Sequence, residues 1–590
     1  MLGVTIDGSY VSLAPYEAGE PVPVWKPAIG ADGQPVPGAF DAHVLDENGN
    51  RVLRVERRYT LAPGSFELSI EQRAINLTDD DLLVRLFQTG PADLRQESFY
   101  GGDKRRVRFG YFLDPAIEPT QTFVQADERL AGRGSLLGPK TNGYYDVERQ
   151  IWPTPKSLEN DRTLVWTAFT NRYFAVAVHP LPPAGETLDA AIPRRVFDRV
   201  DRILADNVNG EGMVIRLVTP ERALPAGAGL NFSHGGYAGP LSRPIINEDP
   251  LLSTFNLGGL VVYNLGGPCA FCTFAWITDA LHFVLLFAHD HLVFDWALAI
   301  ILLVVVVRTI LHPVTRWSQI RMQRFGKQMQ DMAPKQKKLQ ERYKDDPKKL
   351  QQEMGKLWRE EGVNPAGMLG CLPMFLQTPV WIALYATLYY SFELRHSPAF
   401  FGVFQTITGG AWPFLSDLAA TDSFIPLPGA VNLGIAKIDA INILPFVLGI
   451  VFFIHQKYMT PPPSASMTPE QKSQQRLSRV MTVVLFPIIM YAAPSGLALY
   501  FVTNSTIAIF ESRMIRSSAE KKGLLDVQPK KKKAGKPGGF LGRLYEMAEQ
   551  QQKMREQQTT GPGRDQTRAQ QRAMRPNAGR QLPQPKRKKK

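Results

Sequence analysis

The chain has 590 residues, with 68 Lys and Arg against 55 Asp and Glu, which gives a formal net charge of +13 at pH 7. This length excludes a single small domain and allows two or more. The mean hydropathy of -0.16 does not exclude a membrane protein, because nearly all the long apolar runs lie in the second half of the sequence.

Residues 1–250 have the pattern of β-strands. Segments such as FELSIEQ, LVWTAF and YFAVAV alternate or run apolar over strand lengths, and Gly, Pro, Asn and Asp separate them. We expect one large antiparallel β-sandwich. Its carboxylates and histidines show no catalytic spacing, which favours a packing or docking domain over a membrane-anchored enzyme that acts on glycans or lipids.

Residues 251–293 read as a connector that ends in an amphipathic helix. Apolar residues recur at three- and four-residue spacing from 275 to 288, with Asp279 and His282 on the opposite face. Such a helix beside a membrane span should lie in the interface.

Two short motifs flank this helix. His289-Asp290-His291 follows it, and we expect an interfacial turn there, because adjacent residues rarely converge on one metal ion. Cys269 and Cys272 have the spacing of a redox motif but lack the surrounding βαβ pattern, and Cys371 should lie across the membrane from them. A small disulfide and two free thiols both stay open.

Four apolar runs predict membrane-spanning helices at residues 296–311, 369–392, 441–458 and 481–510. The first three are near the ~20 residues that a helix needs to cross the hydrocarbon core. The fourth is longer and is interrupted at Pro494-Ser495-Gly496, which splits it into two shorter spans. We therefore expect five spans in a helical core at residues 294–516.

Lys and Arg in the loops set the expected orientation. Basic residues crowd the segments after the first, third and last spans, whereas residues 393–440 contain only Arg395 and Lys437. This predicts residues 1–290 outside and the C-terminus inside. The opening MLGVTIDGSYVSL lacks the basic and apolar regions of a signal peptide, so we expect a first helix that is cleaved or missing from the sequence rather than an unaided crossing.

Arg308 interrupts the apolar run VVVVRTILHPVT at residues 304–315. An ionised side chain at membrane depth costs roughly 3 kcal/mol or more, so the arginine needs a reason. Thr315 follows about 10 Å along the helix, which leaves snorkelling to the cytoplasmic surface as the alternative to a polar groove. Helical Cβ atoms tilt toward the helix N-terminus, here the outer side, and this favours the groove.

Residues 316–362 predict a cytoplasmic helical hairpin. The first helix should run to about Lys344, Asp346 can cap the second helix with Pro347 at its first position, and Gly362 supplies the stop. Methionines recur at helical spacing in the first helix, at Met322, Met329 and Met332. They form either a packing stripe or an adaptable surface for apolar segments of partner proteins.

Residues 517–590 form a basic tail rich in Lys, Arg, Gln and Pro, with the runs KKKK and KRKKK. Such a composition does not bury a core, so we expect disorder on the cytoplasmic side, apart from a helix around residues 540–557. The charge favours RNA or anionic lipid, and the sequence leaves that choice open.

Three ordered stretches resemble the YidC family of membrane protein insertases. They are VVRTILHPVT, the segment from LQERYKDDPKKL to MFLQTPVWIALY, and PSGLALYFVTNSTIAIFESRMI, and together they cover most of residues 295–516. WTAFTNRYFAVAVHP and YAGP match more thinly the periplasmic β-supersandwich of Gram-negative members, which also carry an N-terminal helix.

The resemblance implies a five-helix core around a hydrophilic groove that is open to the cytoplasm and to lipid. In the family, an arginine in the first core helix faces this groove and attracts the polar, often acidic, outer segment of a substrate; Arg308 matches it. Tyr500 matches an aromatic position associated with substrate contact, whereas the family's second tyrosine is Phe501 here. The further polar residues at membrane depth, which would line the groove or bond neighbouring helices, are Gln377, Thr503 and Asn504.

The implied function is insertion and folding of integral membrane proteins in the bacterial inner membrane, with a periplasmic N-terminal domain and without covalent chemistry, metal or cofactor. Expected partners are nascent membrane proteins, the ribosome, the Sec translocon and anionic lipids, but not DNA. No nucleotide-binding loop is apparent. The alternative is an anion transporter or channel that uses Arg308, but no internal repeat supports it.

Overall fold

The computed structural model describes residues 2–13, 24–97, 100–112, 124–127, 131–160, 162–181, 196–263, 274–344, 346–360, 372–432, 437–459 and 469–524. Cys269, Cys272, Cys371 and Gly362 lie outside these ranges, as does the tail beyond residue 524. The expectations for these residues therefore stay predictions.

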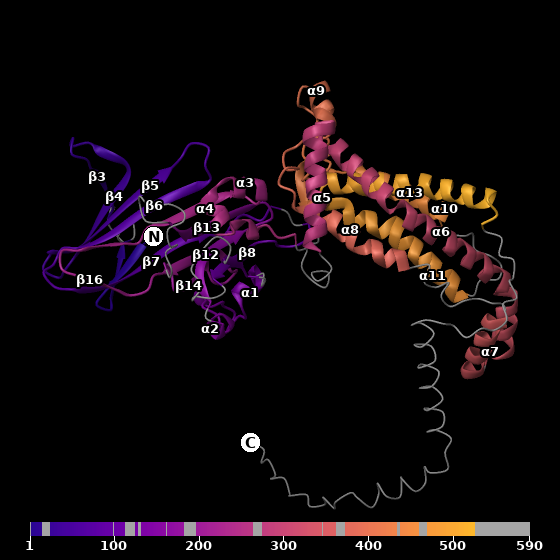
Figure 1. The fold of residues 1–590 in the computed structure, drawn as a ribbon, viewed down its shortest axis with the longest axis horizontal. Coiled ribbons are helices and arrows are strands. Elements are labelled where there is room, and N and C mark those ends of the chain that lie inside the picture. The colour runs from indigo at the N-terminus through magenta and orange to yellow at the C-terminus, as the bar shows by residue number, and fades with distance from the viewer. Residues whose placement is uncertain are drawn as a thin grey trace, which may run out of the picture. The chain divides into compact units, whose positions relative to one another are not determined.

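Two antiparallel sheets make up the N-terminal half (Figure 1). In strand order, one contains β11 (Glu148–Trp152), β14 (Arg199–Asp206), β15 (Glu211–Val218), β7 (Leu82–Ala92), β1 (Leu2–Ile6) and β2 (Ser9–Leu13), with β16 (Arg222–Leu224) also on β7. The other contains β10 (Ala131–Gly132), β8 (Arg106–Phe112), β12 (Thr163–Thr170), β13 (Phe174–Pro180), β18 (His234–Pro240), β6 (Glu67–Asn76), β5 (Arg51–Leu61), β4 (Pro35–Leu45) and β3 (Lys26–Ile29). Two short strands extend it: β17 (Gly229–Asn231) pairs with β6, and β9 (Val124–Ala126) pairs with β8.

Alternating residues of the two sheets share one core. Leu82, Val84 and Leu86 on β7 are buried, and they pack in the same cluster as Leu53 and Val55 on β5. Side chains at every second position of a strand point to the same face, so this burial places the two sheets face to face. The predicted antiparallel sandwich is confirmed.

Short helices lie between the strands and after the last one. They are α1 (Arg133–Leu137), α2 (Pro155–Glu159), α3 (Arg243–Glu248), α4 (Pro250–Thr254) and the 3-10 turn η1 (Leu257–Leu260). The turn after α4 packs on the sandwich, because the buried Trp166 indole donates a hydrogen bond to the carbonyl of Phe255 at 2.8 Å. The connector therefore belongs to the sandwich up to this point.

Helix α5 (Ala275–Ala288) has the predicted bounds, and its polar residues have partners in other elements. Asp279 pairs with Arg243, and His282 lies 3.2 Å from Glu393. The exposed face is aromatic, with Trp276 at 72% and Phe283 at 68%. Large exposed aromatic residues are typical of a helix at a membrane interface, which agrees with the interfacial location predicted for this helix.

The expected turn after α5 is a π-helix, η3 (His289–Val293). The two histidines point to different partners: the His289 ring stacks on Trp296, and the His291 ring on Phe287. They do not converge, and the described residues contain no group of three or more side chains placed to hold a metal ion.

Helix α6 (Trp296–Arg342) is continuous for 47 residues, whereas the sequence predicted a span and a separate hairpin helix. Pro313 and Pro334 lie inside it without ending it. The following α7 (Pro347–Glu360) begins where expected, and the Asp346 carboxylate accepts a hydrogen bond from the backbone N–H of Lys349 at 3.1 Å.

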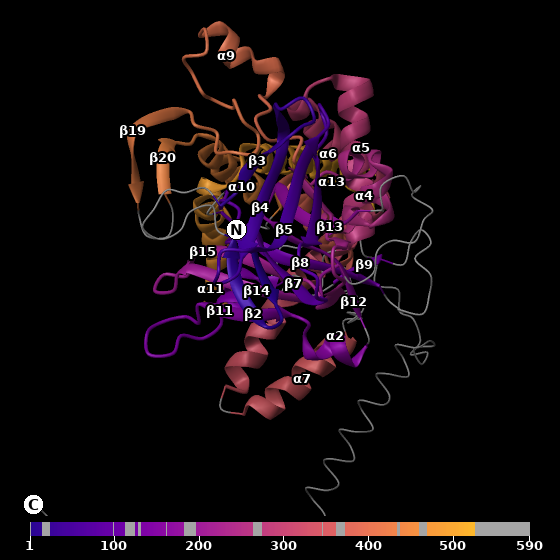
Figure 2. The ribbon, with the colours of Figure 1, turned by 90° about the vertical axis from the view of Figure 1, so that its left-hand side faces the viewer.

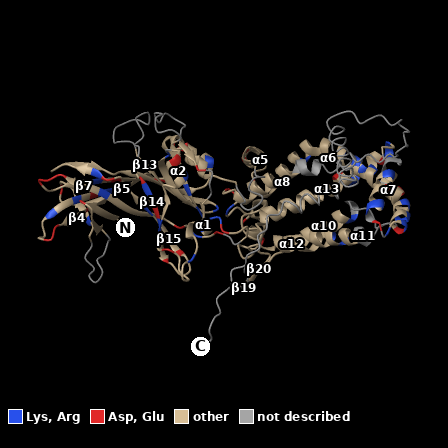
Figure 3. Ribbon diagram, turned by 90° about the horizontal axis from the view of Figure 1, so that it is seen from below, with Lys and Arg blue, Asp and Glu red and all other residues tan. Residues whose placement is uncertain are grey.

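Further helices follow α7, and Figure 2 and Figure 3 label several of them. Those that overlap the other predicted runs are α8 (Leu372–Tyr390), α10 (Leu444–Met459), η6 (Met481–Leu485), α12 (Phe486–Ile489), η7 (Met490–Ala492) and α13 (Ser495–Lys521). Helix α11 (Pro469–Val480) lies in the segment that was predicted as a basic loop. Between α8 and α10 lie η5 (Phe400–Gly402), α9 (Val403–Ile407) and the hairpin β19 (Ile425–Asn432) and β20 (Lys437–Ile441).

The predicted spans differ in how well the helices of the structure match the length and apolarity of a membrane-spanning helix. Among the described residues, one helical stretch, Trp296–Gln328, is long and apolar enough to cross a membrane, and Leu444–Lys457 is a shorter apolar helix. The break at Pro494 is confirmed, since η7 ends at Ala492 and α13 begins at Ser495. One apolar core joins α5, α6, α8, α10 and α13, but a five-span arrangement stays a prediction.

Candidate functional site

Arg308 on α6 reaches across to α13. Its Nε donates to Asn504 Oδ1 at 2.9 Å, and its Nη2 donates to the backbone carbonyl of Asn504 at 3.0 Å. Its Nη1 donates to Glu511 Oε2 at 2.9 Å. The guanidinium is therefore held on the neighbouring helix rather than extended along α6.

Glu511 also contacts the next turn of α6. Its Oε1 lies 2.8 Å from His312 Nδ1. Residues four apart on a helix share a face, as do residues seven apart, so Arg308 with His312 and Asn504 with Glu511 form two matching stripes. This spacing explains how two helices distant in sequence build one polar cluster.

The ion pair is largely withdrawn from solvent, whereas the His312 side chain is 36% exposed. The Glu511 side chain is 7% exposed and that of Arg308 is 22% exposed. A buried ion pair is tolerated only when hydrogen bonds satisfy its remaining donors and acceptors, and Asn504 and His312 supply such bonds. Two charges, an amide and an imidazole thus form a small polar site inside an apolar helix pair.

Polar contacts continue along both helices. The Gln319 amide donates to Ser512 Oγ at 3.2 Å, and Arg324 donates to the carbonyl of Leu524. Residue numbers increase together along α6 and α13 in these contacts, so the two helices run in the same direction. The ion pair lies at the apolar end of this series of contacts.

Tyr500 lies one turn before Asn504 on α13 and is 1% exposed. Its hydroxyl is buried and has no hydrogen-bond partner among the described residues. Phe501 packs against Trp381 and Phe486, with ring centroids 5.5 and 5.1 Å apart. The residue that replaces the family's second tyrosine therefore has an aromatic packing role.

The other predicted site residues are only partly brought together. Thr503 is half-buried on α13 next to Asn504, and Gln377 lies in α8 with its side chain outside the described part of the structure. Of the three hairpin methionines, Met322 is 56% exposed and Met332 is 3% exposed, while the Met329 side chain is not among those described. Met322 and Met332 thus differ in environment.

Sequence reasoning missed Glu511 and His312. Glu511 lies one residue beyond Phe510, where the last predicted span ends, and His312 lies one residue beyond Leu311, where the first ends. The available signal was spacing: a histidine four residues after Arg308 and a carboxylate seven residues after Asn504. That signal identifies a pair only if the two helices are already known to be neighbours.

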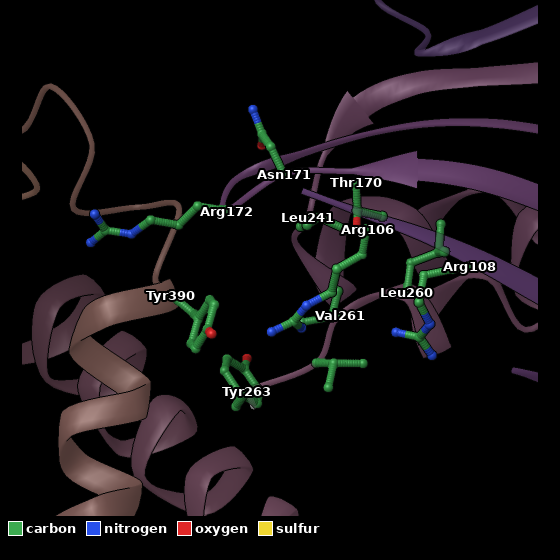
Figure 4. Close-up of a pocket in the computed structure, with 11 residues that line it drawn as sticks. Arg106, Arg108, Thr170, Asn171, Arg172, Leu241, Leu260, Val261, Tyr263 and Tyr390 are labelled. Carbon is green, nitrogen blue, oxygen red and sulfur yellow. The ribbon is translucent and has the colours of Figure 1, made fainter. Parts of the chain in front are cut away.

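A second group of cations lies beside the end of α8. Figure 4 shows Arg106 directed toward Tyr390 and Tyr263, with Arg108 on the far side of Val261. A cavity of about 20 Å³ lies among these residues. Burial, followed by repulsion from Arg106, lowers the pKa of Arg108 to about 10.

The other contacts of these arginines are structural. Arg108 donates to the carbonyls of Asp127 and Gly259. The Nε of Arg172 donates to the carbonyl of Tyr389 at 2.6 Å, and its guanidinium carbon lies 3.8 Å from the centre of the Tyr389 ring. This cluster joins the sandwich to α8.

Comparison with known proteins gives consistent results. Residues 287–522 match the model of a family described as 60Kd inner membrane protein. A protein of Mannheimia succiniciproducens named membrane protein insertase YidC is 31% identical over 482 residues, which cover 81% of this chain and 75% of that protein. One of the same name from Shewanella sp. (strain MR-7) is 30% identical over 370 residues, which cover 62% of this chain and 56% of that protein, so the match spans little more than half of that relative.

A solved structure titled as an active YidC insertase with the first transmembrane domain resolved aligns with 82% of this chain and 82% of its own. Its sequence identity is 16% and its TM-score is 0.28.

Proposed function

The chain belongs to the YidC family of membrane protein insertases, and we propose that it inserts and helps to fold integral membrane proteins through the polar site between α6 and α13. The observation that supports this proposal is the Arg308–Glu511 ion pair, held with Asn504 inside two apolar helices. Ionisable groups at membrane depth are costly and mark a path for polar segments.

The proposed mechanism needs no covalent chemistry. A polar site partway across the membrane shortens the apolar distance that a polar client segment must cross. The driving force is burial of the client's own ~20 apolar residues in lipid. Arg308 attracts the outer segment, and Tyr500, Thr503 and Gln377 are proposed to line the same groove.

The sequence argues against the alternative of an anion transporter or channel, because it shows no internal repeat or pair of broken helices of the kind found in transporters. A long helix that continues from the site to the basic α7 fits delivery of clients from the cytoplasmic side better.

The proposed setting is the bacterial inner membrane, with the β-sandwich in the periplasm and the end of α13 in the cytoplasm. The basic residues of α7 and α11 support this orientation, and Figure 3 shows Lys and Arg on both. Nascent membrane proteins are the proposed substrates, and the ribosome, the Sec translocon and anionic lipids the proposed partners. The exposed Met322 is proposed to contact apolar client segments.

Photocrosslinking tests the proposal directly. A photoreactive residue replaces Leu311 or Thr503, next to the ion pair, and ribosomes stalled on a membrane-protein nascent chain are added. We expect crosslinks from both positions, whereas a probe at Phe446, which is 60% exposed on α10, serves as the position control. Equal crosslinking of a soluble nascent chain would refute a client site at the ion pair.

A further inference from the structure

The carboxylate of Glu511 divides its two oxygens between two residues of α6. Oε2 accepts from Arg308 Nη1 at 2.9 Å, and Oε1 lies 2.8 Å from His312 Nδ1. The side chain is 7% exposed. The charge of Arg308 is therefore neutralised within the protein before any client arrives.

Asn504 accepts hydrogen bonds from the other two nitrogens of the Arg308 guanidinium. Its Oδ1 and its backbone carbonyl accept from Arg308 Nε and Nη2, at 2.9 and 3.0 Å. These two bonds fix the plane of the guanidinium without using the donor that faces Glu511. Of these three hydrogen bonds, the one to Glu511 is therefore the one that can exchange while the arginine stays in place.

We propose that Glu511 is an internal counter-ion, which an acidic client segment displaces from Arg308 while His312 retains the displaced carboxylate. Glu511 thereby sets which clients gain from the arginine: an acidic segment must compete with it, and a neutral segment leaves the pair intact. This inference rests on the proposed insertase function.

The exchange follows from the cost of an unpaired buried charge. Removing one partner of a buried ion pair leaves the other charge uncompensated, so Arg308 releases Glu511 only to another anion. Displaced Glu511 also needs a partner, and the neighbouring His312 already contacts its second oxygen. Replacement of one carboxylate by another preserves the pairing throughout.

Two other titratable side chains lie near Arg308 in the part of the chain that the structure describes. His455 on α10 is close enough to experience the charge of Arg308, and so is the phenol of Tyr500. Neither supplies a second carboxylate. Among the described residues that hydrogen-bond to Arg308, Glu511 is the anion, so its removal should change the charge of the site by one unit.

The test compares Glu511→Gln with the unaltered full chain in liposomes. Two single-span clients differ only in the outer segment, which carries carboxylates in one and the corresponding amides in the other. Without its counter-ion, Arg308 should attract the acidic client more strongly, with roughly tenfold higher insertion or crosslinking, equivalent to about 1.4 kcal/mol. The amide client should be unaffected.

Two further variants separate this role from general damage. Glu520→Gln is the matched control, because Glu520 lies on the same helix and pairs with Arg516 at 3.0 Å but is 55% exposed; it should change neither client. His312→Gln should slow the acidic client selectively, because the displaced carboxylate loses its second partner. Thermal unfolding of each variant in detergent reports whether it is folded.

The outcomes distinguish failure of the counter-ion inference from failure of the proposed insertase function. If folded Glu511→Gln changes both clients by the same factor, or neither, Glu511 has only a structural role and the inference is wrong. If the unaltered chain inserts neither client, the proposed function itself is wrong. Should Glu511→Gln not fold, Glu511→Asp retains the charge with a shorter reach: it should raise the acidic preference, and an unchanged preference would overturn the inference.

Discussion

Arg308 contributes both charge and hydrogen bonds to the site, and substitutions can separate the two. Arg308→Lys retains the charge but replaces a fork of donors with one ammonium group. We expect this variant to keep much of the insertion activity, because attraction of acidic segments depends mainly on charge. Arg308→Ala should impair clients with acidic outer segments most.

The measurement is the insertion of the acidic and amide clients by each variant at equal protein amounts. Arg308→Ala also leaves buried Glu511 with His312 as its remaining contact, and loss of one partner of a buried pair costs about 3–5 kcal/mol. Unfolding is therefore recorded in parallel. Equal insertion of both clients by a folded Arg308→Ala protein would contradict the prediction.

His234 makes the sandwich sensitive to acid. Its ring is fully buried: its Nε2 lies 2.6 Å from the Gln88 amide nitrogen, and its Nδ1 lies 3.2 Å from the carbonyl of Phe232. Arg57 donates to Gln88 Oε1, so the Gln88 amide nitrogen donates to the ring, which is neutral. Burial, with repulsion from Arg57, lowers the pKa of His234 to about 3.

The sign of the effect follows from this pKa. Below pH 6.5 the unfolded chain binds a proton at His234, whereas the folded chain binds one only near pH 3. The free energy of unfolding is therefore unaffected by His234 above pH 6.5. It decreases by roughly 1.4 kcal/mol per pH unit as the pH falls toward 3, because the unfolded chain binds the proton and the folded chain does not. Thermal unfolding between pH 7 and 4 should show a steeper loss for the unaltered chain than for His234→Gln. Parallel pH profiles would show that His234 is not responsible; His396→Gln, at an exposed histidine, is the control.

At the scale of elements, the extension of α6 and α7 beyond the membrane core should be essential for insertion. Deleting residues 319–362 should abolish insertion, because the hairpin stands at the proposed entrance of the site. That deletion also removes the contacts of Gln319 and Arg324 with α13. A shorter deletion of residues 330–360 preserves both contacts and is the cleaner test: normal insertion by this variant, when stably expressed, would refute a role for the hairpin.

The β-sandwich should be dispensable for insertion, because it lies outside the proposed path of the client. Deleting most of residues 1–250 removes Arg172 and Tyr100, which hydrogen-bond to Tyr389 at 2.6 Å each. We expect lower thermal stability and retained insertion when the truncated protein is integrated in the membrane. Loss of insertion by an integrated truncation would contradict this prediction.

Local patterns predicted individual elements better than their junctions. The bounds of α5 and the break at Pro494 follow from apolar spacing and from the stop signal of proline, which act within a few residues. The continuity of α6 through Pro313 was not predicted, because the end of the span was inferred from amino-acid composition. The composition changes from apolar to polar near this residue, but the helix continues. The π-helix after α5 has no comparable sequence signal.

The site was predicted only in part, again because local patterns identify single residues but not their partners on other helices. Arg308 and Asn504 stand out as polar residues within apolar runs, and the structure brings them into contact. Glu511 does not stand out, since it begins a polar segment, and its role depends on the packing of α13 against a helix about 200 residues earlier. Such pairing is a tertiary property that one sequence does not encode in a local pattern.

At the scale of the whole molecule, positive charge is concentrated toward one proposed side of the membrane. The loop between α8 and α10 contains two basic residues, whereas α7 and α11 are rich in them. The same excess continues in the sequence of the tail, with KKKK at residues 530–533 and KRKKK at residues 586–590. This places the tail, in the proposed orientation, where ribosomes deliver clients.

The tail should therefore raise ribosome affinity in a strongly salt-dependent way. Binding of Lys and Arg to RNA phosphates releases counterions, so affinity falls steeply as salt increases. Anionic lipid would attract the same residues, so ribosome binding is measured with detergent-solubilised protein, with and without residues 526–590, across a salt series. Truncation should weaken binding and flatten the slope of log affinity against log salt. Indistinguishable affinities and slopes would show that the ribosome is not the partner of the tail, because a segment that neutralises RNA phosphates cannot be removed without reducing that slope.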